Sequence, residues 1–276
     1  MSTKASSRWS RLAAIDRVGL VFLCALCAIA LMLLVLPSVI VVGISFTEKA
    51  YIGFPPAGFS FRWYTELLQH RQLMDSALTS LRIAGTTTIA ALALGVPAAF
   101  ALVRGRFPAR AGATAFVVAP QMLPGMVLGI AILFTGAYFA FHQSMTMVVL
   151  AMTVFVLPFA VRMVMARLAL LDPTLDEAST VLGANRSQTF LRVTLPQLTP
   201  AVIAAAAFVF IEAFDNITVA LFTASPRARP LSVELYNLVQ FDSSPIVASL
   251  SSLEILLAFI VLVVLARTVG LDRLRS

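Results

Sequence analysis

Three polar residues with helical spacing, Glu212, Asp215 and Asn216, interrupt a long apolar run in the second half of the chain. Positions i, i+3 and i+4 lie on one face of a helix. Acidic groups are costly inside a membrane and usually face the interior of a helix bundle or water. These residues could form the polar wall of a translocation pathway through the membrane and attract a cationic solute. Alternatively, they could hydrogen-bond to a neighbouring helix or subunit. Glu254, in the last apolar run, is a further candidate.

Two prolines four residues apart, Pro120 and Pro124, interrupt another apolar run, and Gly125 follows them. A proline inside a helix removes a backbone donor and leaves a carbonyl group free. Such broken helices are tolerated in membranes where they are buried in protein or line a wet cavity. We expect this break to lie near the translocation pathway. The alternative is a simple kink that serves only helix packing.

A polar stretch at residues 172–196 carries signals for helices in water. Asp172 can cap a helix whose first turn holds Pro173, because a missing N–H has no consequence there. Thr174 and Glu177 have the spacing of a capping box. The stretch therefore predicts more order than a simple connection between two apolar runs requires.

The same stretch predicts a turn and a second helix. The apolar residues of the first helix share one face, which is formed by Leu175, Ala178 and Leu182. Gly183 permits a turn that a residue with a Cβ would resist. Ser187 can begin a second short helix, and Pro196 is expected to stop it. We interpret this helix–turn–helix as a docking element, with an ordinary capped surface helix as the alternative.

The spacing of residues in this stretch resembles a motif of a known protein family. Glu177-Ala178-Ser179, three residues, Gly183, nine residues and then Val193-Thr-Leu195-Pro196 is similar to the "EAA" loop of ABC importer permeases. Ser179 stands where that family usually has alanine, and Val193 where it has isoleucine. The resemblance implies that the loop forms a coupling helix in a groove of an ATPase. The coupling residues would be Glu177, Ala178, Ser179, Gly183, Leu195 and Pro196.

The resemblance also implies a fold, a location and partners. The expected fold is the MetI-like permease fold, all-α with six transmembrane helices, in a bacterial inner membrane. The expected partners are a cytoplasmic ABC ATPase dimer, a second permease subunit and an extracytoplasmic solute-binding protein. The chain is most similar to the polyamine branch of the family, which implies spermidine, putrescine or a similar small solute. That likeness rests on Phe61-Arg-Trp-Tyr64, Ala213-Phe-Asp-Asn216, Leu221-Phe222, Leu231-Ser232 and Pro245, with Ala213 and Ser232 departing from the pattern.

The composition excludes an ordinary soluble domain. Hydrophobic residues make up 60% of the 276 residues and charged residues only 12%, against about a quarter charged in soluble domains. A spanning helix needs about 20 apolar residues, and lipid admits little irregular backbone. We expect one transmembrane domain over 18–270 between tails at 1–17 and 271–276. Its six spans are expected at 18–44, 81–103, 111–135, 145–161, 199–222 and 246–267.

Basic residues indicate the orientation, because cytoplasmic loops are rich in lysine and arginine. With six spans, one side holds both termini, the docking loop and most of the 20 basic residues. These are Lys4, Arg8, Arg11, Arg17, Arg104, Arg106, Arg110, Arg162, Arg167, Arg186, Arg192, Arg267, Arg273 and Arg275. Both termini are therefore expected in the cytoplasm. A basic face on anionic lipid accounts for the net charge of +7 without nucleic acid.

Two other classes of function need different chemistry. A self-sufficient secondary transporter would use Glu212, Asp215 and Glu254 to carry protons or sodium. A membrane-embedded enzyme would need a nucleophile beside a base, but His70 and His142 both fall in expected outer loops. The chain has no Gly-x4-Gly-Lys-[Ser/Thr] loop, so ATP hydrolysis is expected in a partner chain. We expect no metal site and no cofactor.

Overall fold

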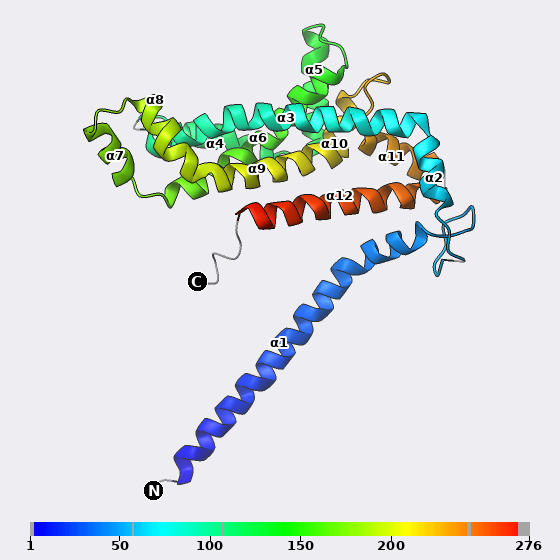
Figure 1. Ribbon diagram of the computed structural model, residues 1–276, viewed down its shortest axis with the longest axis horizontal. Helices are drawn as coiled ribbons and strands as arrows, with labels where there is room; N and C mark the ends of the chain where they lie inside the picture. Colours follow the sequence, from blue (N-terminus) through cyan, green and yellow to red (C-terminus); the bar gives the residue numbers. More distant parts are fainter. Residues whose placement is uncertain (1–2, 57, 106, 242–243, 270–276) are drawn as a thin grey trace. The chain divides into compact units, whose positions relative to one another are not determined.

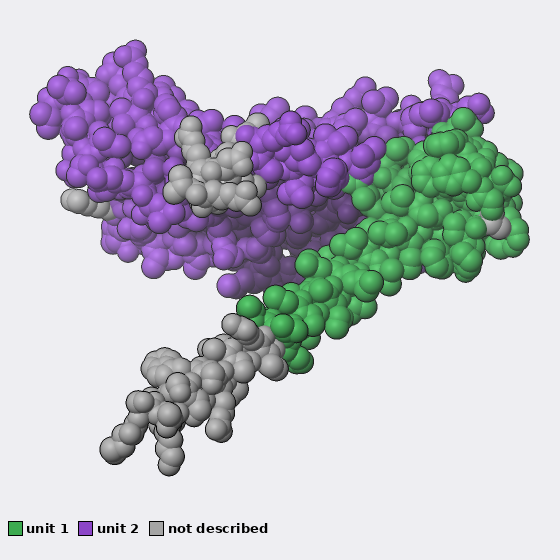
Figure 2. All heavy atoms as spheres, turned by 60° about the horizontal axis from the view of Figure 1, so that its bottom comes forward, with its two compact units in different colours: residues 1–66, 244–255 green, residues 67–243, 256–276 purple. Residues whose placement is uncertain are grey.

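The computed structural model describes residues 3–56, 58–105, 107–241 and 244–269, excluding the side chains of residues 3–18 and 268–269. The described residues form helices joined by loops and include no β-strand, as Figure 1 shows. It divides into two compact units, coloured in Figure 2: residues 1–66 with 244–255, and residues 67–243 with 256–276. The expected tail at 271–276 lies outside the described residues.

The first unit joins α1 (Thr3–Ile44), the start of α2 (Arg62–Gln69) and the start of α12 (Ile246–Val269). Trp63 is buried there, and its indole N–H donates to the carbonyl of Thr47 at 2.8 Å. In residues 1–17, for which either a loose tail or a short helix is expected, the backbone is helical from Thr3 onward as part of α1.

Three long helices form the centre of the second unit: α3 (Arg71–Arg104), α6 (Met145–Ala169) and α9 (Leu195–Asp215). Small residues let these helices approach closely, as lipid-embedded helices commonly do. A Cβ placed on Gly95 of α3 would lie 3.2 Å from the Cβ of Ala160 on α6. Leu198 at the start of α9 is fully buried in the same core.

The helix bounds correct two of the expected spans. Helix α3 begins ten residues before the expected start at 81, because Ser76 and Ser80 are buried against neighbouring helices although they are polar. Helix α6 begins at the expected residue, where Ser144 caps it, but it continues to Ala169 rather than ending at 161.

The span expected at 111–135 is broken. Helix α4 (Arg110–Val118) leads into a 3₁₀ turn (Ala119–Met122), and α5 (Gly125–Tyr138) leaves at an angle of 103°. Leu123 and Pro124 between them have extended backbone. The prolines therefore produce the expected break, but the segment is not one straight helix.

The span expected at 199–222 is also interrupted. Helix α9 ends at Asp215, and α10 (Ile217–Thr223) starts after Asn216, whose backbone is extended. Pro196 does not stop the preceding helix as expected. Helix α8 (Arg186–Thr189) continues through a π-helical turn (Phe190–Thr194) into α9, where Pro196 occupies the first turn and needs no N–H partner.

Two further helices, α7 (Thr174–Val181) and α11 (Leu231–Phe241), complete the described fold. Within the described residues, five helical stretches are long and apolar enough to cross a membrane. The count becomes six if the bent pair α4–α5 is one span. The all-α membrane fold inferred from the sequence is confirmed.

Candidate functional site

The loop interpreted as a docking element begins with α7, whose first residue is bonded by an acidic side chain. The carboxylate of Asp172 accepts a hydrogen bond from the backbone N–H of Thr174 at 2.9 Å. This backbone bond, with help from the Thr174 side chain, holds the pKa of Asp172 below its ordinary value. The capping box expected from Thr174 and Glu177 does not form, because Thr174 is already the first residue of α7 and Pro173 stands at the N-cap, where no side chain caps the helix. Asp172, expected as the cap, lies one residue earlier and bonds only the N–H of Thr174.

Gly183 ends α7 in the left-handed conformation, with φ of +88°. The N–H of Gly183 donates to the carbonyl of Thr180 at 3.0 Å, and the N–H of Ala184 donates to that of Ser179 at 3.1 Å. These two bonds form a Schellman motif, in which glycine avoids the strain that a Cβ would cause. No atom outside the neighbouring residues lies within 4 Å of a Cβ built here, so the requirement is conformational rather than steric.

The second helix of the loop starts at a cap that the sequence interpretation missed. Asn185 and Gln188 bond each other's backbone N–H groups through their side chains, both at 2.9 Å. This capping box starts α8 at Arg186, so Ser187 is not its first residue as expected. The signal was readable, because asparagine followed three residues later by glutamine fits the capping-box pattern.

Asp176 ties α7 to the rest of the second unit. One of its carboxylate oxygens accepts a hydrogen bond from Thr194 at 2.8 Å, and the other lies 3.6 Å from Nε of Arg104. Arg104, at the end of α3, also donates to the carbonyl of Leu171 at 3.0 Å. Both charged side chains are about four-fifths buried. The sequence interpretation missed this anchor, because its members are distant along the chain.

A second polar contact supports the same arrangement. The hydroxyl groups of Ser179 and Thr189 lie 2.6 Å apart, and Ser179 also donates to the carbonyl of Asp176 at 3.0 Å. An alanine at position 179 would make neither bond. The loop is therefore a braced helix pair.

The outer face of α7 is apolar and exposed. Leu175 is 48% exposed, Val181 86% and Leu182 88%. Glu177 and Ala178 are exposed on the same helix. Leu195 and Pro196 lie apart from this face at the start of α9, where Leu195 packs into the core. The expected coupling residues thus form two groups. Glu177 and Ala178 are exposed on α7, whereas Leu195 packs into the core at the start of α9.

Of the acidic and amide residues expected to line a pathway, only Glu212 and Asp215 lie together on one helix. Glu212 is half-buried and Asp215 exposed near the end of α9. Asn216 does not continue their face, because its side chain caps α10 by accepting from the N–H of Val219 at 3.0 Å. Glu254 belongs to the other compact unit.

The two helix breaks of the second unit, between α4 and α5 and between α9 and α10, lie close together. Pro120 is half-buried and Pro124 exposed, and a Cβ on Gly125 would collide with the hydroxyl of Thr218, two residues after Asn216. One helix turn later, a Cβ on Gly129 would lie 3.2 Å from the carbonyl oxygen of Thr218. Irregular backbone from distant parts of the chain is therefore concentrated beside the α5–α10 contact.

Comparisons with known proteins give a consistent result. The family model described as "Binding-protein-dependent transport system inner membrane component" matches residues 91–271. The putrescine transport system permease protein PotI of Escherichia coli (strain K12) is 31% identical over 204 residues, which are 71% of this chain and 73% of PotI. The spermidine/putrescine transport system permease protein PotC of the same strain is 27% identical over 243 residues, 88% of this chain and 91% of PotC.

Solved structures share the fold. A chain of a bacterial ABC transporter involved in the import of alginate matches with a TM-score of 0.71 and 17% identity, covering 91% of this chain and 96% of that chain. A chain of the MetNI methionine ABC transporter in an inward-facing conformation matches with a TM-score of 0.60 and 21% identity, covering 71% and 94%.

Proposed function

The chain belongs to the family of binding-protein-dependent inner-membrane transport components, and on that premise we propose that it lines the solute pathway and couples to a cytoplasmic ATPase through α7. It is an ABC importer permease of the MetI type, homologous to polyamine permeases. Permeases of this family are transport subunits rather than enzymes. This assignment removes the reason for an ion-coupled secondary transporter based on Glu212, Asp215 and Glu254.

One observation carries the coupling proposal: α7 exposes an apolar face while its other side is braced. The exposed Val181 and Leu182 would be favourable to bury, at about 1.5–3 kcal/mol for a fully buried side chain. Asp176 joins the same helix to Arg104 on α3 and to Thr194 beside α9. Movement of an ATPase bound to this face would be transmitted through α7 to two long helices.

The proposed complex has a cytoplasmic ABC ATPase dimer, a second permease chain and an extracytoplasmic solute-binding protein. Both termini and α7 lie on the cytoplasmic side, as the basic residues favour. Closure of the ATPase dimer on ATP moves α7 as a rigid body, and the spans alternate between inward-open and outward-open states.

For the solute we propose a polyamine such as spermidine or putrescine. The named relatives PotI and PotC support this class. Glu212 and Asp215, close together on α9, supply negative charge suited to a cation. The breaks at Pro120, Pro124 and Asn216 provide the irregular backbone that lines pathways in other transporters.

Gly183→Arg tests the coupling role. The left-handed turn resists any residue with a Cβ, so we expect the variant to insert into the membrane normally but to lose ATP-dependent uptake of labelled spermidine or putrescine by at least about tenfold. Gly183→Asn is the matched control and should keep most of the uptake, because asparagine tolerates this conformation. Normal uptake by a properly inserted Gly183→Arg variant would contradict the proposal.

A further inference from the structure

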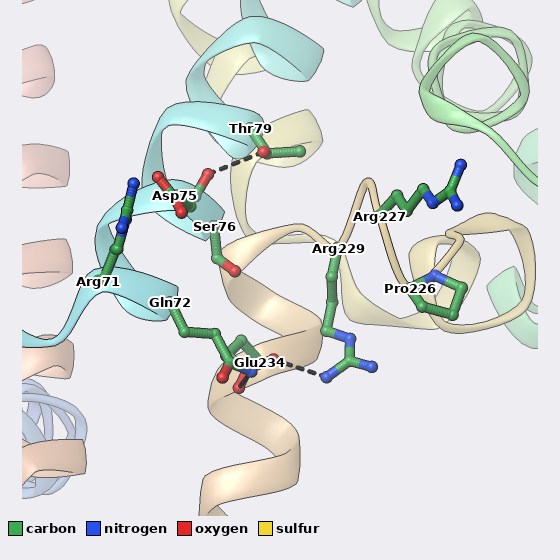
Figure 3. A pocket seen from close by; sticks show the side chains of 9 residues that line it. All are labelled: Arg71, Gln72, Asp75, Ser76, Thr79, Pro226, Arg227, Arg229 and Glu234. Atoms are coloured by element: carbon green, nitrogen blue, oxygen red, sulfur yellow. Dashed lines mark hydrogen bonds and ion pairs between the residues drawn. The ribbon is translucent and has the colours of Figure 1, made fainter.

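A charged pocket lies at the opposite end of α3 from the coupling loop. It has a volume of about 500 Å³ and is formed by the first turns of α3, the 225–230 turn and the start of α11. Figure 3 shows its lining, which is Arg71, Gln72, Asp75, Ser76, Thr79, Pro226, Arg227, Arg229 and Glu234. All of these residues belong to the second unit.

One arginine of this pocket, Arg229, is held by a buried acid, and a second, Arg227, is exposed on a tight turn. Glu234 is buried, and its carboxylate accepts from Arg229 at 3.0 Å and from the side chain of Gln72. Arg229 is thereby held in place with donors left over, since a guanidinium has five N–H groups. Arg227 follows Pro226 in a turn closed by the bond from the N–H of Ala228 to the carbonyl of Ser225 at 3.0 Å.

The pocket has unused donors. Ser76 is only 5% exposed, lines the pocket, and its hydroxyl has no hydrogen-bond partner among the described residues. The Ser76 hydroxyl is open to the pocket rather than sealed inside the protein, so it can donate to a ligand that accepts a hydrogen bond. Within the same described part of the chain, Arg71 and Arg227 form no ion pair.

The charges favour an anion. The charge of Glu234 is balanced by its ion pair with Arg229. The remaining charged residues of the lining are the cations Arg71 and Arg227 and the anion Asp75, so positive charge is in excess. Asp75 is on the same helix as Arg71, four residues later, so Arg227 is the cation with the least compensation. Guanidinium groups bind carboxylates through paired hydrogen bonds, and the Ser76 hydroxyl adds a further donor.

With Arg82 taken as the outer edge of the hydrocarbon core, the pocket is expected beyond the lipid headgroups. The uncharged run of α3 lies between Arg82 and Arg104. At a rise of 1.5 Å per residue, Ser76 lies about 9 Å and Arg71 about 16 Å past Arg82 along the helix. The headgroup layer is only about 5–8 Å thick on each side. A lipid phosphate is therefore disfavoured, and a partner in the aqueous phase is favoured.

We propose that this pocket receives an aspartate or glutamate side chain of the extracytoplasmic solute-binding protein. The proposal rests on the proposed function, which supplies that partner and places this end of α3 outside the cytoplasm. A pocket with three arginines would not recruit a polyamine, so it is a docking site rather than a substrate site. The pocket and α7 lie at opposite ends of α3, so substitutions in the pocket alter no residue of the proposed coupling loop.

The test uses the complete importer in lipid nanodiscs and the solute-binding protein that stimulates its ATP hydrolysis. Arg227→Gln should raise the Kd of this binding protein about tenfold, in line with the loss of a charge-assisted hydrogen bond. Asp75→Asn should lower the Kd a few fold, because it removes an unpaired carboxylate that repels the incoming one. Arg82→Gln is the matched control on an exposed arginine outside the pocket, and should leave the Kd unchanged.

The outcomes separate the two proposals. An unchanged Kd in Arg227→Gln and Asp75→Asn, with wild-type stimulation intact, would overturn the docking site and leave the proposed function standing. An effect seen only with anionic phosphatidylglycerol, and absent in phosphatidylcholine, would overturn it in favour of a lipid headgroup site. A wild-type complex that no solute-binding protein stimulates would overturn both proposals.

Discussion

At the scale of residues, the structure of the loop at 172–196, the proposed coupling loop, depends on a few side chains with distinct tasks. Asp172 bonds the first residue of α7, Gly183 ends the helix, and Asp176 joins it to the neighbouring helices. The first two act on their own neighbours in sequence, while the third acts across the fold. The exposed Leu182 makes no contribution to that bracing and is free to contact a partner protein.

Asp176→Ala should uncouple ATP hydrolysis from transport. It removes a hydrogen bond to a charged group and an ion pair that is about four-fifths buried, together about 2 kcal/mol of local stabilisation. The exposed face of α7 is left intact, so ATPase binding should persist. We expect solute transported per ATP to fall severalfold in proteoliposomes. Asp172→Ala, which removes a bond to the first residue of the same helix, is the comparison, and equal coupling in Asp176→Ala and wild type would contradict the bracing role.

The sequence predicts part of the local chemistry of this loop and misses the contacts that act across the chain. The turn at Gly183 follows from residue type and spacing alone. Asp172 bonds the first residue of α7, but Pro173 rather than Asp172 stands at the N-cap. Asp176 looks like an ordinary acid in a helix's first turn, and nothing in its neighbourhood indicates Arg104 or Thr194. Asn216 shows the opposite error, because helical spacing placed it with Glu212 although its side chain prefers to cap α10.

At the scale of elements, the course of the chain is determined by the breaks in the helices as well as by the helices themselves. The sequence predicts the break at Pro120 and Pro124, because proline has a fixed backbone cost in a helix. It also predicts a stop at Pro196, which is wrong because the π-helical turn before α9 brings this proline into a first-turn position. Composition gives the number and approximate place of the apolar segments, but the surrounding packing decides where each helix bends.

Gly129→Leu tests the close contact of α5 and α10. A Cβ there would lie 3.2 Å from the carbonyl oxygen of Thr218 and 3.3 Å from Cα of Val219, so backbone would have to move. Overpacking of this kind costs about 1–3 kcal/mol, and we expect a lower Tm of the detergent-purified protein and weaker transport. Gly112→Leu on α4, where no heavy atom lies within 4 Å, should change the Tm little. Equal Tm shifts in both variants would argue against a tight contact.

At the scale of the molecule, α3 connects two surfaces with different proposed partners. Arg104 at its end contacts the coupling loop, and Arg71 at its start lines the charged pocket. The 34 residues between and including them span about 50 Å at 1.5 Å per residue, more than the thickness of a bilayer. One continuous helix is thus long enough to reach both faces of a membrane, and the proposed partners on the two sides would act on the same helix.

The measurement that tests the central claim most directly is cysteine cross-linking of α7 in the complex purified in mild detergent. Cys24 and Cys27 are first replaced by alanine, and a single cysteine is placed at Leu182 or, as a control, at the exposed Phe134 of α5. We predict that the cysteine at Leu182 cross-links to a co-purifying ATPase, more strongly when ATP closes the ATPase dimer, and that the cysteine at Phe134 does not. A complex that contains the ATPase but gives no cross-link at Leu182, or a chain that transports without any ATPase, would contradict the account.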